Sequence, residues 1–339
     1  MGCLSRMTRT QFWLAGSGVG LPKTLVASAD LDAGIAKPAG WLEKQCGVQQ
    51  RYVCGLETQD DLAFLAARNA LEQADIEPSV VDLLIFASSV PKQPIPATAP
   101  LVARRLGLRS GHCTTFDVNA TCLSFLTGLD IATSYVASGR YRCVVVVSAE
   151  MASRALPWAT DPATAGLFGD GAAAVVVTPA RPGSTHTVHS AHFETYHEGY
   201  EFCQIPSGGT GIDVHVDPAR FAAGTYFQMD GPNLFRLSAK HFPGFISRLL
   251  EKAGWSASQV GLIVPHQASA LALDHLVKRC GFMHDQVVNI VATYGNQIAA
   301  SIPTALHIAR KQQRLTPGTK MLLLGTSAGV MFGGMAIEL

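Results

Sequence analysis

The chain has 339 residues, 48% of them hydrophobic, which is enough for one large or two medium domains with a continuous core. Its 26 Lys and Arg residues nearly balance its 25 Asp and Glu residues, so charge gives no reason to expect nucleic acid, an anionic membrane or an acidic partner. The longest apolar runs fall far short of the roughly 20 residues that a membrane span requires.

The N-terminal segment does not fit an export signal. Arg6 and Arg9 are basic, but residues 12–22 are interrupted by glycines and predict a strand, whereas a signal peptide needs a continuous apolar region and a small-residue cleavage site. An acylated terminus at Gly2 fits poorly, because the myristoylation pattern needs Ser or Thr where Arg6 stands. We therefore expect a cytoplasmic protein.

An internal repeat relates two parts of the chain. Residues 70–85 align without a gap on 249–264, and both segments predict a helix, a turn and a buried strand. Residues 129–147 match 306–324 in the same order, each again a helix that leads into an apolar strand. The repeat predicts two similar halves.

The predicted strands are nearly continuous in Val, Ile and Leu, which indicates a mostly parallel sheet covered by helices on both faces and hence an α/β fold. No low-complexity linker separates the halves. The polar stretch 181–230, rich in His and Gly, predicts an irregular surface insertion that could overhang an active site. We divide the chain into an N-terminal half (1–180), this connection, and a C-terminal half (231–339).

The eight cysteines form no C-x-x-C pair and no spacing with His that suits zinc, so we expect neither disulfides nor a metal site. Most of them should be small buried hydrophobes. Cys122 is the candidate exception, because a predicted strand at 113–118 precedes it and a helical pattern continues after it to about Gly139. At a helix N-terminus, the helix dipole and free N–H groups favour a thiolate and hence a nucleophile.

Two polar residues also follow predicted strands. His266 comes directly after one buried strand, and Asn296 follows another at 287–292. Active sites of α/β proteins gather at the carboxyl ends of strands, and the repeat places matching strand ends around one pseudo-twofold axis. We therefore expect Cys122, His266 and Asn296 to converge.

These motifs, in this order, resemble the ketoacyl-acyl-carrier-protein synthase III family of the thiolase superfamily. They are Cys122, the segment Pro265-His-Gln-Ala268, and the segment Gly295-Asn-x-x-Ala-Ala-Ser-Ile-Pro303. The resemblance extends over nearly the whole chain and includes Leu167-Phe-Gly-Asp-Gly171 and Trp41, which in the family stacks on coenzyme A. It implies a five-layered α-β-α-β-α thiolase fold with two duplicated α/β halves, and a homodimer.

The resemblance also implies an acyltransferase that needs no cofactor beyond its substrates. Cys122 would take an acyl group from acyl-CoA, and a malonyl thioester would then lose carbon dioxide and attack that acyl group, in fatty acid or secondary-metabolite biosynthesis. The malonyl group would arrive on coenzyme A or an acyl carrier protein. His266 and Asn296 would donate hydrogen bonds to its thioester carbonyl, while backbone N–H groups of Cys122 and of the loop 325–329, including Gly329, would form an oxyanion hole.

This sequence departs from the family where substrates are held. Gln45 and Pro162 stand where the family has basic residues, and Ser269 and Leu271 replace an Asn and a basic residue on the carrier-docking helix. Docking to a standard acidic carrier is therefore in doubt.

The predicted acyl pocket differs as well. Ile95 stands roughly where many members carry an aromatic residue that crosses the dimer interface, and Thr326 replaces a bulky aromatic residue near the nucleophile. Smaller residues allow a longer primer, so the pattern favours a secondary-metabolic or medium-chain enzyme over one primed by acetyl groups.

Several other functions remain open. Relatives that join two acyl-CoA molecules head to head without decarboxylation carry a glutamate base in the stretch that corresponds to 92–97, and this chain has none there. Acyl transfer to an alcohol or amine often dispenses with the asparagine that is present here as Asn296. A degradative thiolase would need a second, C-terminal cysteine base, and a non-catalytic partner subunit generally lacks the nucleophile.

Overall fold

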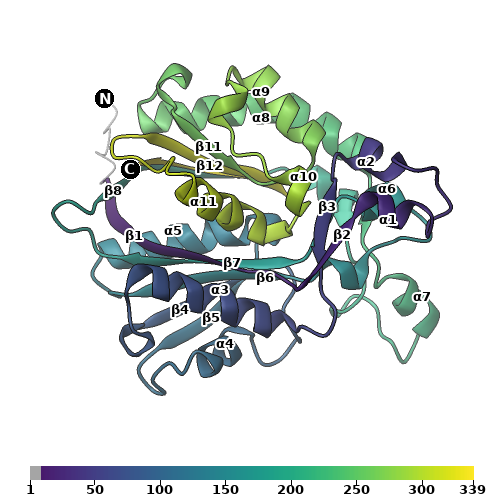
Figure 1. The fold of residues 1–339 in the computed structure, drawn as a ribbon, viewed down its shortest axis with the longest axis horizontal. Helices are drawn as coiled ribbons and strands as arrows, with labels where there is room; N and C mark the ends of the chain where they lie inside the picture. The colour runs from purple at the N-terminus through teal and green to yellow at the C-terminus, as the bar shows by residue number, and fades with distance from the viewer. Residues whose placement is uncertain (1–8) are drawn as a thin grey trace.

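The computed structural model describes residues 9–339, so the predictions made from Gly2 and Arg6 lie outside the described residues. The described chain forms a mixed nine-stranded sheet in the order β11-β12-β13-β8-β1-β7-β6-β4-β5 (Figure 1). Its strands are β1 (Thr10–Gly20), β4 (Leu83–Ala87), β5 (Thr114–Val118), β6 (Val144–Glu150), β7 (Gly171–Thr178), β8 (His186–Thr195), β11 (Leu262–Pro265), β12 (Lys320–Ser327) and β13 (Met331–Glu338).

Helices and short strands complete the chain. The longer helices are α3 (Gln59–Ala74), α4 (Ala99–Arg105), α5 (Ser124–Ala137), α8 (Gly231–Ala253), α9 (Ala270–Cys280) and α11 (Ser301–Lys311). The shorter elements are α1 (Ser28–Asp32), α2 (Trp41–Cys46), α6 (Pro162–Ala165), α7 (Pro218–Ala223), α10 (Val291–Tyr294), β2 (Thr24–Ala27), β3 (Gln50–Val53), β9 (Cys203–Gln204) and β10 (Gln228–Met229).

The strand order confirms the predicted duplication. From the junction outward, one half runs β1-β7-β6-β4-β5 and the other runs β8-β13-β12-β11. Corresponding pairs have the same sense: β4 with β6 and β11 with β12 are parallel, whereas β6 with β7 and β12 with β13 are antiparallel. The halves join through the antiparallel pair β1 and β8.

The two halves of the sheet form two layers of a five-layered α/β fold, as the thiolase resemblance implied. Helices α5 and α11 lie between them, α3 and α4 cover the outer face of the first half, and α8 and α9 cover the outer face of the second (Figure 1). The central cluster of apolar side chains includes residues of both sheet halves as well as of α5 and α11. Full burial of each large apolar side chain contributes about 1.5–3 kcal/mol, so this interior dominates the stability of the fold.

Helix α3 packs unusually close to β1 because both carry small residues. A Cβ atom added at Gly18 would lie 2.4 Å from the backbone nitrogen of Ala70 and 2.5 Å from the carbonyl oxygen of Ala66. The glycines that interrupt the apolar pattern of this strand therefore permit direct backbone contact with the helix.

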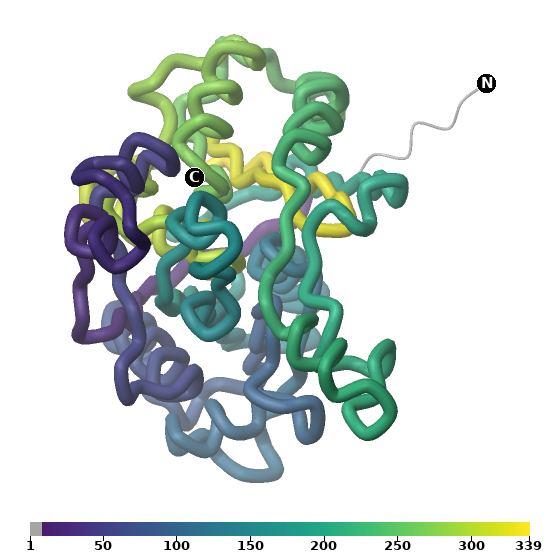
Figure 2. The backbone as a smooth tube through the Cα atoms, turned by 90° about the vertical axis from the view of Figure 1, so that its right-hand side faces the viewer, coloured from purple at the N-terminus to yellow at the C-terminus, as the bar shows by residue number. Residues whose placement is uncertain are grey.

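The prediction of an irregular connection at 181–230 is wrong for its first part, because β8 lies in the middle of the sheet. The polar residues of β8 misled the prediction, because two of its histidines find carboxylate partners in the sheet: His189 Nε2 lies 2.8 Å from a Glu338 oxygen and His192 Nε2 lies 2.8 Å from a Glu194 oxygen. Residues after β8 do leave the main body. Figure 2 shows this segment in green, passing through α7 along one side before it returns to α8.

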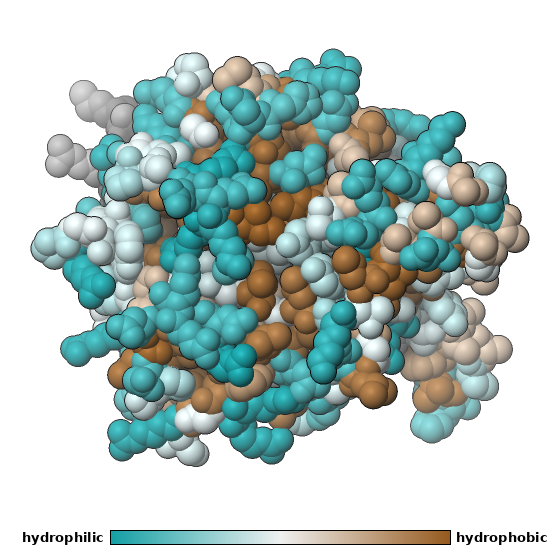
Figure 3. All heavy atoms as spheres, in the orientation of Figure 1, coloured by the Kyte–Doolittle hydropathy of each residue, from teal (hydrophilic) through white to brown (hydrophobic). Residues whose placement is uncertain are grey.

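Hydrophobic atoms are visible across the middle of the face drawn in Figure 3, flanked by hydrophilic side chains above and below. No helix within residues 9–339 is long and apolar enough to cross a membrane.

Candidate active site

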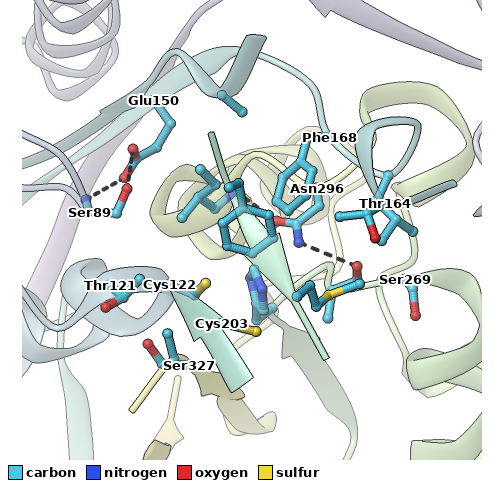
Figure 4. Close-up of a pocket in the computed structure, with 18 of the residues that line it drawn as sticks. Ser89, Thr121, Cys122, Glu150, Thr164, Phe168, Cys203, Ser269, Asn296 and Ser327 are labelled. Atoms are coloured by element: carbon cyan, nitrogen blue, oxygen red, sulfur yellow. Dashed lines mark hydrogen bonds between the residues drawn. The ribbon is translucent and has the colours of Figure 1, made fainter. Parts of the chain in front are cut away.

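A cavity of about 2130 Å³ brings together the three residues that sequence reasoning selected, Cys122, His266 and Asn296. Both halves line it, through the loops that follow β4, β6, β11 and β12, and helices α8 and α9 line its outer part. The segment after β8 contributes Cys203 and Phe227, so this part of the chain does border the site as predicted. Figure 4 shows Cys122, Cys203 and Asn296 around the same space.

Cys122 lies in a tight turn between β5 and α5, here called the Cys122 turn (residues 119–124). Thr121 has a positive φ of 50°, which is unfavourable for a β-branched residue and must be held by its surroundings. The Asn119 Oδ1 atom accepts the Thr121 N–H at 2.9 Å, and the Ser124 Oγ atom accepts the Ala120 N–H at 2.9 Å. These local bonds fix the backbone that presents the thiol.

The thiol is more difficult to ionise than sequence position suggested. Burial raises the pKa of Cys122 to about 12, and the nearby Cys203 and Glu150 side chains add to the increase. Backbone hydrogen bonds with Ala328 and with Cys122 itself oppose it. The predicted position before a helix is confirmed, but the predicted preference for thiolate is wrong in the free protein, because desolvation outweighs the helix N-terminus.

The backbone N–H group that approaches the thiol belongs to Ala328, which sequence reasoning did not single out. Gly329 lines the same cavity and adopts a φ of 120°, a conformation that strongly favours glycine. It therefore shapes the loop that carries the Ala328 amide.

Asn296 lies in a second turn, here called the Asn296 turn (residues 296–301), which leads into α11. Its Oδ1 atom accepts the Ile298 N–H at 2.8 Å, the Ser301 Oγ atom accepts the Gln297 N–H at 3.0 Å, and Ile298 has a φ of 50°. The same three features occur in the Cys122 turn. In this correspondence Ala299 occupies the place of Cys122.

The amide of Asn296 retains donor capacity toward the cavity. Its Nδ2 atom donates to the Ala268 carbonyl oxygen at a long 3.3 Å, seen as a dashed line in Figure 4, and a primary amide carries two N–H donors. Asn296 is therefore able to donate a further hydrogen bond to a ligand.

His266 follows β11 and is only 4% exposed. Burial lowers its pKa to about 4, against a smaller opposing effect of a backbone hydrogen bond with Ile298. The imidazole is thus neutral at physiological pH and acts as a neutral hydrogen-bonding group. Gly325 makes room for it, since a Cβ atom there would lie 2.5 Å from the His266 Cβ.

Glu150 also lines the cavity, at the end of β6, and sequence reasoning missed it. Its carboxylate accepts the Ser89 N–H at 2.7 Å and the Ser89 hydroxyl at 2.6 Å (Figure 4). Burial raises its pKa to about 8, although these bonds and a backbone hydrogen bond with Ala299 oppose that shift. Nothing in the local sequence marks a buried carboxyl, because its partners are distant along the chain.

The predicted substrate-binding residues divide into two groups. Ser269 and Thr326 line the cavity, although the Ser269 hydroxyl already caps the start of α9. Ile95 is 85% exposed and does not line the cavity of its own chain. Trp41 lies outside the lining too, with Lys37 Nζ 5.0 Å from its ring centre.

Comparison with known proteins agrees with this architecture. The family described as 3-oxoacyl-(acyl-carrier-protein) synthase III matches residues 116–196, and its C-terminal counterpart matches 250–339. A beta-ketoacyl-(acyl-carrier-protein) synthase III of Streptomyces coelicolor is 36% identical over 98% of both chains. One of Neisseria meningitidis is 32% identical over 96% of this chain and 98% of its own.

Solved structures give the same result. The synthase III of Aquifex aeolicus superposes with a TM-score of 0.86 at 30% identity, over 97% of this chain and 100% of its own. OleA of Xanthomonas campestris superposes with a TM-score of 0.85 over 98% and 99% of the two chains, but its 23% identity shows the fold alone.

Proposed function

This chain belongs to the 3-oxoacyl-(acyl-carrier-protein) synthase III family of acyl-transferring condensing enzymes, and we propose that it loads an acyl group onto Cys122 and condenses it with a malonyl thioester. In the first step the cysteine sulfur attacks the carbonyl of an acyl-CoA, the new thioester forms, and coenzyme A leaves with the thiol proton. The N–H groups of Cys122 and Ala328 are suited to hold the carbonyl oxygen during this attack.

In the second step the bond between the malonyl carboxylate and its α-carbon breaks. Carbon dioxide leaves, the electron pair becomes an enolate, and the α-carbon attacks the acyl-enzyme to give a β-ketoacyl thioester. The cysteine leaves as a thiolate and takes up a proton from solvent. The neutral imidazole of His266 and the amide of Asn296 would donate hydrogen bonds to the enolate oxygen. No cofactor is needed for these bond changes.

The observation that carries the proposal is the meeting of a cysteine turn, a neutral buried histidine and an asparagine turn in one cavity. A neutral histidine supports decarboxylation because it forms no ion pair with the malonyl carboxylate, and an ion pair would stabilise that group before its charge moves to the enolate oxygen.

Intact-mass spectrometry tests the proposal. The protein is exposed to acetyl-, octanoyl- and longer acyl-CoA, and then to malonyl-CoA or a malonyl carrier protein. We expect one acyl adduct on Cys122 that disappears only after a malonyl thioester is added. An adduct that every malonyl donor leaves in place would contradict decarboxylative condensation and favour acyl transfer to another nucleophile.

Head-to-head condensation of two acyl-CoA molecules is the second candidate, but it needs a base that removes an α-proton. Residues 92–97 contain no acidic side chain. Both oxygens of the Glu150 carboxyl group are engaged by Ser89, through its N–H and its hydroxyl. Decarboxylation avoids this requirement, so we favour it.

The primer is proposed to be longer than acetyl. Thr326 is small and lines the cavity beside Ser327, and the pocket continues past Phe227 and Met229 of the segment after β8. Faster loading of octanoyl than acetyl groups in the mass experiment would support this preference, and the reverse order would contradict it.

The side chains at the mouth of the cavity bear on which carrier delivers the malonyl extender. Leu271 of α9 lies there and is 63% exposed, where an acidic carrier would need a cation. We therefore propose that malonyl-CoA serves as well as a malonyl carrier protein. A rate at least about tenfold higher with the carrier would contradict this.

A homodimer is also proposed. Strand β5 ends the sheet, so its outer edge has no partner strand in the described chain. The loop before α4, which carries the exposed Ile95, is held to β5 where the Thr98 N–H donates to Asp117 Oδ2 at 2.7 Å. Sedimentation velocity tests it, since a monomer at micromolar concentration would contradict the proposal.

A further inference from the structure

The Cys122 turn and the Asn296 turn come from different halves, yet one buried acidic side chain is hydrogen-bonded toward the first and lies on a strand packed against the second. Glu150 is the last residue of β6 and is 1% exposed. Toward the Asn296 turn, β6 packs against residues 298–300, and the backbone of Ala299, the residue that takes the place of Cys122 in that turn, acts to lower the pKa of Glu150.

Toward the Cys122 turn, Glu150 acts through Ser89. Both carboxylate oxygens are used, one by the Ser89 N–H at 2.7 Å and the other by the Ser89 hydroxyl at 2.6 Å (Figure 4). The Ser89 carbonyl oxygen in turn accepts the Asn119 Nδ2–H at 2.9 Å, and Asn119 Oδ1 accepts the Thr121 N–H at 2.9 Å. A continuous chain of hydrogen bonds thus runs from Glu150 to the residue before Cys122, while the strand that carries Glu150 packs against the Asn296 turn.

We propose that Glu150 is a positioning residue that sets the register between the two turns, so that the enolate formed beside Asn296 reaches the acyl group on Cys122. It touches neither reacting group. Acyl loading depends on the Cys122 turn, and decarboxylation depends on His266 and the Asn296 turn. Only formation of the carbon–carbon bond requires both turns in register, so this step depends most on Glu150. The kinetic part of this inference rests on the proposed function.

The structure offers a matched control in Ser327, the last residue of β12. Its hydroxyl donates to the Ala120 carbonyl oxygen at 2.8 Å, so it supports the Cys122 turn from the other half. It has no hydrogen bond to the Asn296 turn among the described residues. Ser327→Ala therefore removes a hydrogen bond that supports the Cys122 turn, and it leaves the link through Glu150 between the two turns unchanged.

The experiment measures coupling, which is the ratio of carbon dioxide released from malonyl-CoA to β-ketoacyl product formed on pre-acylated enzyme. Wild type should release one carbon dioxide per product. The assay is run at about pH 9, above the pKa of Glu150 of about 8, so that the group is ionised. Glu150→Gln then keeps the size of the side chain but replaces one acceptor oxygen with a donor that opposes the two donors of Ser89. Since about 1 Å of misplacement costs roughly 100-fold in rate, we expect condensation to fall about 10- to 100-fold and decarboxylation less than about threefold.

Ser327→Ala should slow acyl loading and keep the coupling ratio at that of wild type. A ratio that stays at one in Glu150→Gln, with all steps slowed equally, would overturn the inference and leave Glu150 as a merely structural residue. Uncoupling in Ser327→Ala of the same size would also overturn it, because the link would then not be specific to Glu150.

Hydrogen–deuterium exchange provides a test that does not need enzyme activity. It reports on the backbone of each turn even if Glu150→Gln is less stable than the wild type. We expect Glu150→Gln to increase exchange in peptides covering both 119–124 and 296–301, and Ser327→Ala to increase it in 119–124 alone. Unchanged exchange in 296–301 of Glu150→Gln contradicts the positioning role. If the two variants show the expected exchange but the wild-type protein forms no acyl-enzyme, the proposed function is refuted and the structural link still stands.

Discussion

The Cys122 turn and the Asn296 turn have the same backbone shape but different chemistry. Each begins with an Asn whose side chain accepts the N–H two residues later, and each includes a residue with a φ of 50°. In the first turn the reactive side chain is Cys122, while Asn119 is occupied by the Ser89 carbonyl at 2.9 Å. In the second, Ala299 replaces the cysteine and Asn296 faces the cavity. The duplication thus gives two turns with the same backbone structure. The chemistry is decided by one side chain in each turn, Cys122 in the first and Asn296 in the second.

The nucleophile and the histidine of the cavity are both uncharged in the free protein. Burial raises the pKa of Cys122 to about 12 and lowers that of His266 to about 4, so both groups are neutral near pH 7. The negative charge of the malonyl carboxylate then moves, during the reaction, onto an enolate oxygen that faces hydrogen-bond donors.

Removing the nucleophile should have the largest effect. Cys122→Ala eliminates the only group proposed to form the thioester, so we expect acyl loading to fall by more than about 1000-fold. Intact-mass spectrometry measures the adduct. Cys203→Ala, which changes a second thiol lining the cavity, should still accept one acyl group, and loading that survives Cys122→Ala but not Cys203→Ala would reverse the assignment.

Replacing each of the two asparagines by alanine tests the comparison directly. Asn296→Ala removes a donor to the enolate, so we expect decarboxylation to fall about 100-fold while acyl loading changes little. His266→Ala should give the same pattern. Asn119→Ala, at the corresponding position, should instead slow acyl loading, because it releases the strained Thr121 backbone. If both asparagine variants impair the same step, the two turns do not serve acyl loading and decarboxylation separately.

Alkylation across pH should expose the environment of the thiol. Because the pKa of Cys122 is raised, the reactive thiolate fraction in the free protein should keep increasing by about tenfold per pH unit from about pH 7 to pH 10. Iodoacetamide labelling followed by peptide mass spectrometry measures this rate. A plateau below about pH 8 would show that the helix N-terminus dominates after all.

The smallest effect is expected from placing a cysteine in the second turn. Ala299 is buried and does not line the cavity, so Ala299→Cys in a Cys122→Ala background should not restore acyl loading. The added sulfur should lower the free energy of unfolding by about 1–3 kcal/mol, which urea denaturation measures. Restored loading would mean that the turns are interchangeable.

Sequence reasoning predicted the α/β class from the apolar strands and the duplication from the repeat, and the structure brings its three selected residues into one cavity. It failed for β8, where polar residues are accommodated by sheet partners that the sequence does not reveal. It also failed for the pKa of Cys122, because a helix N-terminus is a local feature whereas desolvation depends on tertiary packing. Glu150 was missed for the same reason, since its partners Ser89 and Ala299 lie far along the chain.

The central claim is that Cys122 carries the acyl group while the Asn296 side of the cavity produces the carbanion. A single-turnover reaction tests it most directly: enzyme acylated on Cys122 is mixed with malonyl-CoA labelled with carbon-13 in the free carboxylate. We predict that each adduct lost yields one labelled carbon dioxide and one β-ketoacyl thioester. Loss of the adduct as free acid, or its persistence while no labelled carbon dioxide appears, would contradict the account.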